Sequence, residues 1–180
     1  MTESTMITKE HLSYQAQKAY VATMMKVVGG GLAAASRVDE TVQKELAALP
    51  EGFQVCMTVF PSGPSFFLRI GKNGHSEVIS APVGKPELTI RFKHLSHAFL
   101  VFSFQEGTAQ AFANDRMIAD GNVSHAIRLV RCLNKMETLI LPRLIAERAV
   151  KRYDAVPLTE KITKATRIYG LVAKSLIAGN

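Results

Sequence analysis

The sequence has few cysteines, which excludes the small secreted proteins that disulfide bonds hold together. Its 180 residues include two, Cys56 and Cys132, and two thiols are too few for a disulfide framework. Both stand among apolar neighbours, where a reduced thiol behaves as a small hydrophobic group. We therefore expect two buried free thiols in a cytoplasmic protein.

The sequence also lacks an apolar run long enough to cross a membrane. Its longest uncharged stretch, residues 52–68, is interrupted by Pro61, Gly63 and Pro64, whereas a spanning helix needs about 20 apolar residues. The first fifteen residues contain acidic side chains and no apolar block, so we expect no cleaved secretion signal. With 47% apolar and 21% charged residues, the composition is that of a globular protein with a substantial core.

No residues are spaced as a catalytic site requires. Ser124 and His125 are neighbours on a predicted helix, where adjacent side chains point about 100° apart and cannot face each other as nucleophile and base. Asp115 and Asp120 flank a predicted strand five positions apart, which puts them on opposite faces and does not support paired acid and base chemistry. We predict a protein that is not an enzyme and needs no cofactor.

Metal and nucleotide sites are not indicated either. His94 and His97 could share a helix face, but no third ligand is near them in sequence and structural zinc normally takes four. The triplet Gly29-Gly30-Gly31 lacks the preceding strand and the Gly-Lys-Ser/Thr of a phosphate-binding loop. We predict no metal site, and we interpret the glycines as a break in a helix that serves as a hinge or as a close helix contact.

Positive charge is unevenly distributed along the chain. The net charge is +7, from 22 basic and 15 acidic residues. Residues 1–122 hold 11 of each, so the whole excess lies in residues 123–180, which hold 11 basic and 4 acidic residues. The sequence has no tight run of Lys and Arg and no basic strand with paired aromatics, so we predict no nucleic-acid partner.

The hydrophobic pattern predicts helices, then strands, then helices. The turn Asn73-Gly74 indicates a hairpin, because both positions of such a turn need a positive φ. Apolar residues at helical spacing predict helices, and alternation at a period of two predicts strands. The predicted helices are residues 10–28, 39–49, 96–104 and 107–113, and the predicted strands are 53–60, 66–70, 75–80 and 88–92.

Residues 116–122, Arg-Met-Ile-Ala-Asp-Gly-Asn, predict a short strand, a glycine turn and the start of a helix. Asn122 should cap that helix, residues 123–141, because its side-chain oxygen can accept from the unpaired amides of the first turn. Pro142 should break or kink the helix. Two more helical segments are predicted over residues 144–153 and 159–178, and the second is basic and amphipathic.

This order of elements resembles the sterol carrier protein family, the second type of non-specific lipid-transfer protein. The resemblance covers residues 51–142. It includes the alternating strand Pro-Glu-Leu-Thr-Ile-Arg-Phe at 86–92, the turn at Gly107, and Met-Ile-Ala-Asp-Gly-Asn at 117–122, where the last strand ends and the helix begins. It implies an α/β (α+β) fold in which a curved, mainly antiparallel five-stranded sheet is covered by helices around an apolar tunnel. Asn122 stands where the family often has Asp. Residues 1–50 and 143–180 are helical additions outside this core.

The resemblance also implies a function, which is binding and carriage or presentation of an apolar lipid such as a sterol, a fatty acyl chain or an isoprenoid. Apolar residues at these spacings usually form an ordinary core, but some should line a tunnel if the resemblance holds. The alternative is an interaction or oligomerisation module, or an accessory factor that docks on an enzyme of lipid or quinone biosynthesis. The candidate lipid-binding residues are Phe92, Phe99, Phe102, Phe104, Met117, Ile127, Val130, Leu133, Met136 and Ile140.

The basic helix predicted over residues 159–178 has two interpretations. It can pack its apolar stripe on the domain, which we favour slightly, or lie on an anionic membrane through Lys161, Lys164, Arg167 and Lys174. Each cation near such a surface adds on the order of 1 kcal/mol to binding. The predicted location is the cytoplasm, with peripheral contact with a membrane as a further option.

Overall fold

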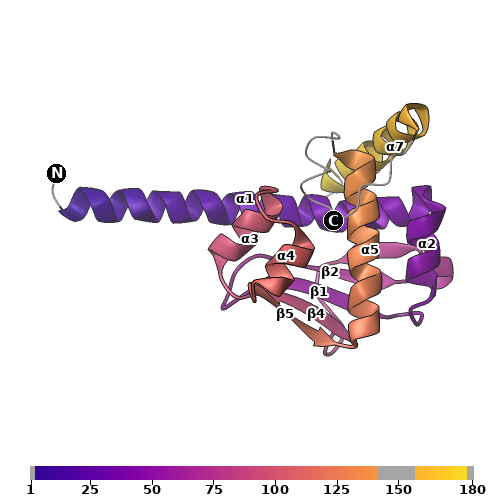
Figure 1. Cartoon of the computed structure of the whole chain (residues 1–180), viewed down its shortest axis with the longest axis horizontal. Helices are drawn as coiled ribbons and strands as arrows, with labels where there is room; N and C mark the ends of the chain where they lie inside the picture. The colour runs from indigo at the N-terminus through magenta and orange to yellow at the C-terminus, as the bar shows by residue number, and fades with distance from the viewer. Residues whose placement is uncertain (1–2, 142–156, 178–180) are drawn as a thin grey trace.

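The structure is a computed structural model that describes residues 3–141 and 157–177 (Figure 1). Pro142 and the helix expected over residues 144–153 lie outside the described residues. The helices are α1 (Glu3–Val38), α2 (Glu40–Ala47), α3 (Leu95–Phe102), α4 (Thr108–Ala113), α5 (Val123–Ile140) and α7 (Leu158–Ile177). The strands are β1 (Gln54–Val59), β2 (Ser65–Ile70), β3 (Ser76–Ile79), β4 (Leu88–Phe92) and β5 (Met117–Gly121).

The strands form one five-stranded sheet in the order β3-β2-β1-β4-β5. The central pair, β1 and β4, is parallel, and the other three pairs are antiparallel. The turn between β2 and β3 contains Asn73 at φ 58° and Gly74 at φ 76°, the positive values that the Asn-Gly pair predicts. The predicted five-stranded, mainly antiparallel sheet covered by helices is confirmed.

One face of the sheet is buried under the helices. Val55 and Met57 of β1, Leu68 of β2 and Ile90 of β4 are all at most 5% exposed, and they lie on this covered face. On the opposite face Arg91 is exposed. The core is therefore built on the helix-covered side, while the opposite side is partly open to water, although Cys56 and Thr89 are buried there.

Helix α1 runs unbroken through the three glycines, so the expectation that they break the helix is wrong. They serve as a close contact instead. A Cβ at Gly29 would lie 3.1 Å from the ring of Phe66, and a Cβ at Gly31 would lie 2.6 Å from Sδ of Met136. The missing side chains let α1 approach β2 and α5 closely, and the packing gained keeps residues of low helix propensity helical.

The two terminal helices share the core of the sheet domain. Val21, Met25 and Leu32 of α1 are buried in the same cluster as the strands, together with Ile168 and Val172 of α7. Figure 1 shows that the N-terminal half of α1 extends well past the sheet, while its C-terminal half crosses it. The C-terminal half of α1 and the buried side of α7 therefore belong to the core of the sheet domain. None of the described helices is long and apolar enough to span a membrane.

Candidate functional site

An apolar cavity of about 220 Å³ lies between the covered face of the sheet and the helices. The sheet contributes Met57, Ile90, Phe92 and Met117, and α1 contributes Met24, Val27 and Val28. The remaining described wall residues come from the helical layer: Val101, Phe102, Phe104, Thr108, Phe112, Leu129, Val130, Leu133, Met136, Glu137, Ile140, Leu141 and Tyr169.

The structure places eight of the ten candidate lipid-binding residues on this wall. They are Phe92, Phe102, Phe104, Met117, Val130, Leu133, Met136 and Ile140. Two lie elsewhere: Phe99 packs edge-on against Tyr20 with ring centroids 5.4 Å apart, and Ile127 is 48% exposed. Ile127 lies beside the stripe of α5 that faces the cavity. That any of the ten binds a lipid stays a prediction.

The contribution of α1 to the wall was not predicted. The resemblance begins at residue 51 and so places the first helix outside the lipid-binding core. The signal was nevertheless present, since Val21, Met24, Val28 and Leu32 recur at intervals of three and four residues. This stripe faces the sheet and α5, and it closes the cavity on one side.

Helix α5 is positioned by the turn that precedes it. Gly121 has φ 139°, and a Cβ there would lie 2.5 Å from the carbonyl oxygen of Glu87, so a side chain would disturb the pairing of β4 with β5. Asn122 then accepts a 2.8 Å hydrogen bond from the backbone N–H of Ser124 through Oδ1, as its capping role requires. The predicted start of the helix is confirmed, and the apolar face of α5 is aimed at the sheet.

Glu137 interrupts the apolar face of α5. It lies four residues after Leu133 and three before Ile140, where the helical period would place an aliphatic side chain. Its Oε2 is inaccessible to solvent and has no hydrogen-bond partner among the described residues. Burial raises the pKa of Glu137 from 4.5 to about 8. At neutral pH the carboxyl is therefore mostly protonated, and it can both donate and accept a hydrogen bond.

Glu137 was not predicted as a wall residue, although the sequence places it within an apolar stripe. A carboxyl at i+4 and i−3 from two apolar wall positions is unusual, because acidic residues are rarely buried without a partner. Among the described wall residues, Glu137 is the only carboxylic acid, and no Lys, Arg or His is present. The other oxygen-bearing side chains of this wall are Thr108 and Tyr169.

Helix α7 contributes Tyr169 to the cavity wall, and a hydrogen bond holds this residue against the end of α5. The hydroxyl of Tyr169 donates to the carbonyl oxygen of Ile140 at 2.7 Å. This carbonyl belongs to the last turn of α5, where backbone acceptors lack intrahelical donors. Tyr169 therefore satisfies the end of α5 and contributes its ring to the cavity wall.

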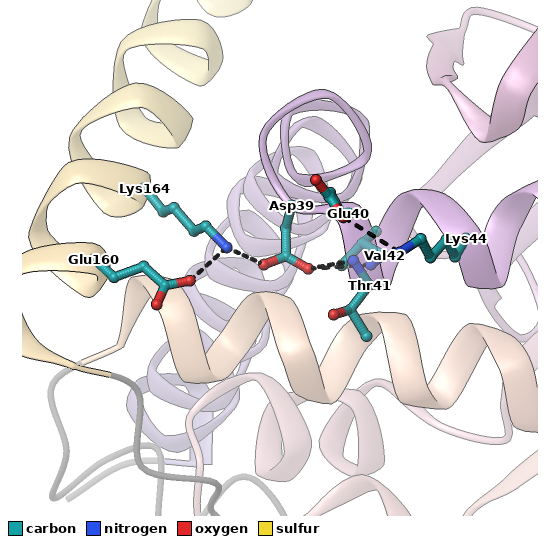
Figure 2. Close-up of polar contacts among 7 residues, drawn as sticks. All are labelled: Asp39, Glu40, Thr41, Val42, Lys44, Glu160 and Lys164. Atoms are coloured by element: carbon teal, nitrogen blue, oxygen red, sulfur yellow. Dashed lines mark hydrogen bonds and ion pairs between the residues drawn. The ribbon is translucent and has the colours of Figure 1, made fainter.

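A second contact of α7 changes the interpretation of Lys164. Its ammonium group lies 2.7 Å from Oδ2 of Asp39 and 2.8 Å from Oε1 of Glu160, with only 23% of the side chain exposed (Figure 2). Lys164 therefore points into the domain, whereas Arg167 and Lys174 are exposed and Lys161 is partly buried. The apolar side of α7 packs on the domain through Ile168 and Val172.

Asp39 is the centre of that contact. Its Oδ1 accepts from the backbone N–H of Thr41 at 3.0 Å and of Val42 at 3.1 Å, which caps α2. Burial raises the pKa of Asp39, but hydrogen bonds from Lys164 and Val42 outweigh this effect and the net pKa is lowered. Asp39 is thus an ionised, buried carboxylate with partners on two helices, in contrast to Glu137.

The other candidate groups have structural roles. The rings of His94 and His97 stack edge-on at 5.0 Å, and no metal-binding group of three or more His, Cys, Asp or Glu occurs in the part of the chain described. Asp115 pairs with Lys93. Cys56 and Cys132 are free and buried, as predicted, and burial raises the pKa of the Cys132 thiol to about 12.

Comparison with known proteins finds similar folds and no similar sequence. No protein-family model and no curated protein matches the chain. Among solved structures it is similar to a ubiquinone synthesis protein named UbiJ-SCP2, with 12% identity over 65% of this chain and 90% of that one, at a TM-score of 0.43.

Two further similar structures are named as sterol carrier proteins. One is the sterol carrier protein domain 2 of Helicoverpa armigera, with 18% identity, coverage of 76% and 93%, and a TM-score of 0.46. The other is the apo form of sterol carrier protein 2 from Yarrowia lipolytica, with 13% identity, coverage of 62% and 88%, and a TM-score of 0.42. These are likenesses of fold to the family that the sequence resembles, and they assign no ligand to this chain.

Proposed function

We propose that this chain binds the hydrocarbon part of a lipid in the cavity and carries or presents that lipid without reacting with it. The observation that supports the proposal is the apolar wall of a cavity of about 220 Å³. An engineered apolar cavity of about 150 Å³ stays dry and takes up benzene. A cavity of this size and lining therefore favours an apolar guest over water.

The size of the cavity bears on how much of the ligand enters. Sites that enclose a whole drug-sized molecule measure about 300–1,000 Å³, so the cavity as it stands has room for a segment of a long chain. Each buried methylene contributes roughly 0.8 kcal/mol before the entropic costs of binding. A longer chain requires the wall to repack. Four methionines lie on the wall, Met24, Met57, Met117 and Met136, and unbranched thioethers adapt readily to a new shape.

Contact with a membrane is the second part of the proposal, and the outward face of α7 supports it. Exposed Arg167 and Lys174 lie on the same helix as the exposed apolar side chains of Ile162 and Tyr169. Such a combination suits the boundary between anionic headgroups and acyl chains. A lipid taken from or delivered to that surface would pass next to Tyr169, which lies on the cavity wall.

Native mass spectrometry of the gently purified protein tests lipid binding, and we expect a co-purified lipid. Met136→Trp and Val130→Trp place an indole in the cavity and should weaken uptake of an added fluorescent fatty acid at least fivefold. Val130 is only partly buried, so its variant should fold even where Met136→Trp does not. Ile127→Trp is the matched control, because Ile127 lies on the same helix outside the cavity. Absence of lipid uptake by the folded wild-type protein would refute the proposal.

A further inference from the structure

The carboxyl of Glu137 needs an explanation that a purely apolar ligand does not supply. A carrier of plain hydrocarbon would gain from an aliphatic side chain at this position, as at Leu133 and Ile140 on the same face of α5. Buried polar groups without a partner are rare in native proteins, because leaving one unpaired costs stability. Oε2 of Glu137 is such a group among the described residues, and Glu137 lies on the cavity wall.

The surroundings of Glu137 determine which partner suits it. No basic side chain is present on the described part of the wall. Tyr169 is the other titratable wall residue, and its hydroxyl already donates to the carbonyl of Ile140, one helical turn after Glu137. Burial is the cause of the raised pKa of Glu137, and it keeps the group neutral near pH 7. The partner therefore has to bind a neutral carboxyl in apolar surroundings.

Three kinds of lipid head can be compared on this basis. A carboxylate or phosphate would bring a buried negative charge to a wall with no described cation, which is costly. An ammonium head would have to lose its hydration and ionise Glu137 in the same apolar space. A hydroxyl or carbonyl head needs no charge, and a protonated carboxyl can donate to either oxygen and accept from a hydroxyl.

We infer that Glu137 is a specificity-determining residue that binds the uncharged oxygen, a hydroxyl or a carbonyl, at the polar end of the ligand. The inference rests on the proposed lipid binding and assigns its chemical class, namely neutral oxygenated amphiphiles in preference to fatty acids, phospholipid headgroups or amines. Glu137 is partly buried, whereas Phe92, Leu129 and Met136 are at most 2% exposed. The ligand therefore lies with its head at Glu137 and its hydrocarbon against these fully buried residues.

A matched series of eight-carbon probes tests the inference: n-octane, 1-octanol, 2-octanone, octanoate and octylammonium. Dissociation constants are measured at pH 7 by NMR titration of protein labelled at the methionine methyl groups, four of which belong to wall residues. The variants are Glu137→Leu, which removes the hydrogen-bonding group, and Glu137→Gln, which keeps a neutral donor and acceptor. Glu40→Gln, at an exposed position on α2, is the control.

The result to compare is the ratio of variant to wild-type Kd for each probe, because this ratio cancels the probe's own cost of leaving water. For Glu137→Leu we expect the ratio to rise about fivefold for octanol and octanone, the effect of one net hydrogen bond, and to stay near or below one for octane. Glu137→Gln should keep the ratios near one for the uncharged probes. In the wild-type protein, octanoate and octylammonium should bind at least tenfold more weakly than octanol.

Two results would overturn the inference. One is an equal change for octane and octanol on Glu137→Leu, and the other is tightest binding of octanoate or octylammonium by the wild-type protein. Neither result would contradict the proposed lipid binding, because in both cases the methionine methyl signals still respond to the probes. If no probe shifts those signals in the wild-type protein, the proposed function itself fails. A larger Glu137→Leu ratio for octanol than for octanone, or the reverse, shows which oxygen group Glu137 binds more tightly.

Discussion

Lys164 of α7 donates a 2.7 Å hydrogen bond to the buried carboxylate of Asp39, 125 positions earlier in the chain (Figure 2). The same carboxylate caps α2 by accepting from the N–H groups of Thr41 and Val42. One side chain thus joins the start of α2 to the C-terminal helix. Since α7 also supplies Tyr169 to the cavity wall, this ion pair helps to hold the wall in place.

Removing the ammonium group of Lys164 should destabilise the protein. Lys164→Met leaves Asp39 as a buried charge without its cation, and we expect the free energy of unfolding to fall by about 2–3 kcal/mol, less than for a fully buried pair because Lys164 is partly exposed. The control is Lys44→Met, which breaks the exposed pair with Glu40 and should cost less than about 0.5 kcal/mol. Urea unfolding measures both, and equal losses would contradict a structural role for Lys164.

Glu137 should make the protein less stable as the pH rises. Its pKa is raised from 4.5 to about 8, so between these values the folded state holds a proton that the unfolded state has released. Stability contributed by this group is fully present below pH 4.5 and is lost as the pH rises through about 8. Glu137→Gln removes this loss. One pKa unit corresponds to about 1.4 kcal/mol. Because Glu137 is partly exposed, we reduce the resulting free energy and expect the variant to be roughly 3 kcal/mol more stable than wild type at pH 9.

The measurement is thermal or urea unfolding of both proteins from pH 4 to pH 9. The difference between them should be small at pH 4, widen through neutral pH and level off above pH 8. A difference that does not depend on pH would mean that Glu137 ionises normally. Folding is the readout, so this result does not depend on the identity of any ligand.

The three glycines of α1 should differ in their tolerance of alanine. Alanine in a helix interior is favoured over glycine by about 0.5–1 kcal/mol. A Cβ at Gly30 would meet Val172 at an ordinary contact distance of 3.7 Å, so Gly30→Ala should stabilise by about that amount. At Gly31 the Cβ would lie 2.6 Å from Sδ of Met136, so the thioether has to move and the gain should be lost. Thermal unfolding of the two variants checks the difference, and equal stabilisation would show that Met136 yields without cost.

The exposed cations of α7 should contribute to binding of anionic vesicles. The double variant Arg167→Gln with Lys174→Gln leaves Lys164 and its ion pairs intact. Each charge contributes on the order of 1 kcal/mol to binding, so the partition coefficient should fall at least tenfold. Co-sedimentation with vesicles containing phosphatidylserine measures this, and vesicles of phosphatidylcholine alone provide the reference. Unchanged sedimentation would refute the membrane part of the proposal. It would leave the cavity unaffected.

The sheet and its flanking helices could be predicted because their signals are local. Alternation around Val55 and Leu68, the Asn73-Gly74 turn and the capping residue Asn122 each indicate a structure within a few residues, and each is confirmed. The triple glycine could not be interpreted in this way. Whether glycine breaks a helix depends on what packs against it, and Phe66 and Met136 are distant in sequence.

The site was harder to predict than the fold for the same reason. Apolar periodicity identified most of the α5 stripe, but it could not show that Ile127 lies beside the cavity, since a shift of one position on a helix separates wall from surface. The sequence likewise predicts that Lys164 is a surface cation, because its partner Asp39 is distant in sequence. Glu137 is the exception, because its position among apolar residues was visible in the sequence.

The close contact of α1 with α5 also bears on the length of hydrocarbon that the proposed lipid binding would accommodate. With only a hydrogen atom at position 31, Sδ of Met136 occupies space beside α1 that a larger residue would deny it, and the thioether would then project into the cavity. We therefore expect the size of the residue at position 31 to limit how far a hydrocarbon chain can enter the cavity. In relatives that bind the same ligand, we expect the side-chain volumes at positions 31 and 136 to change in opposite directions. In relatives whose ligand has a hydrocarbon chain of another length, we expect the two volumes to change together.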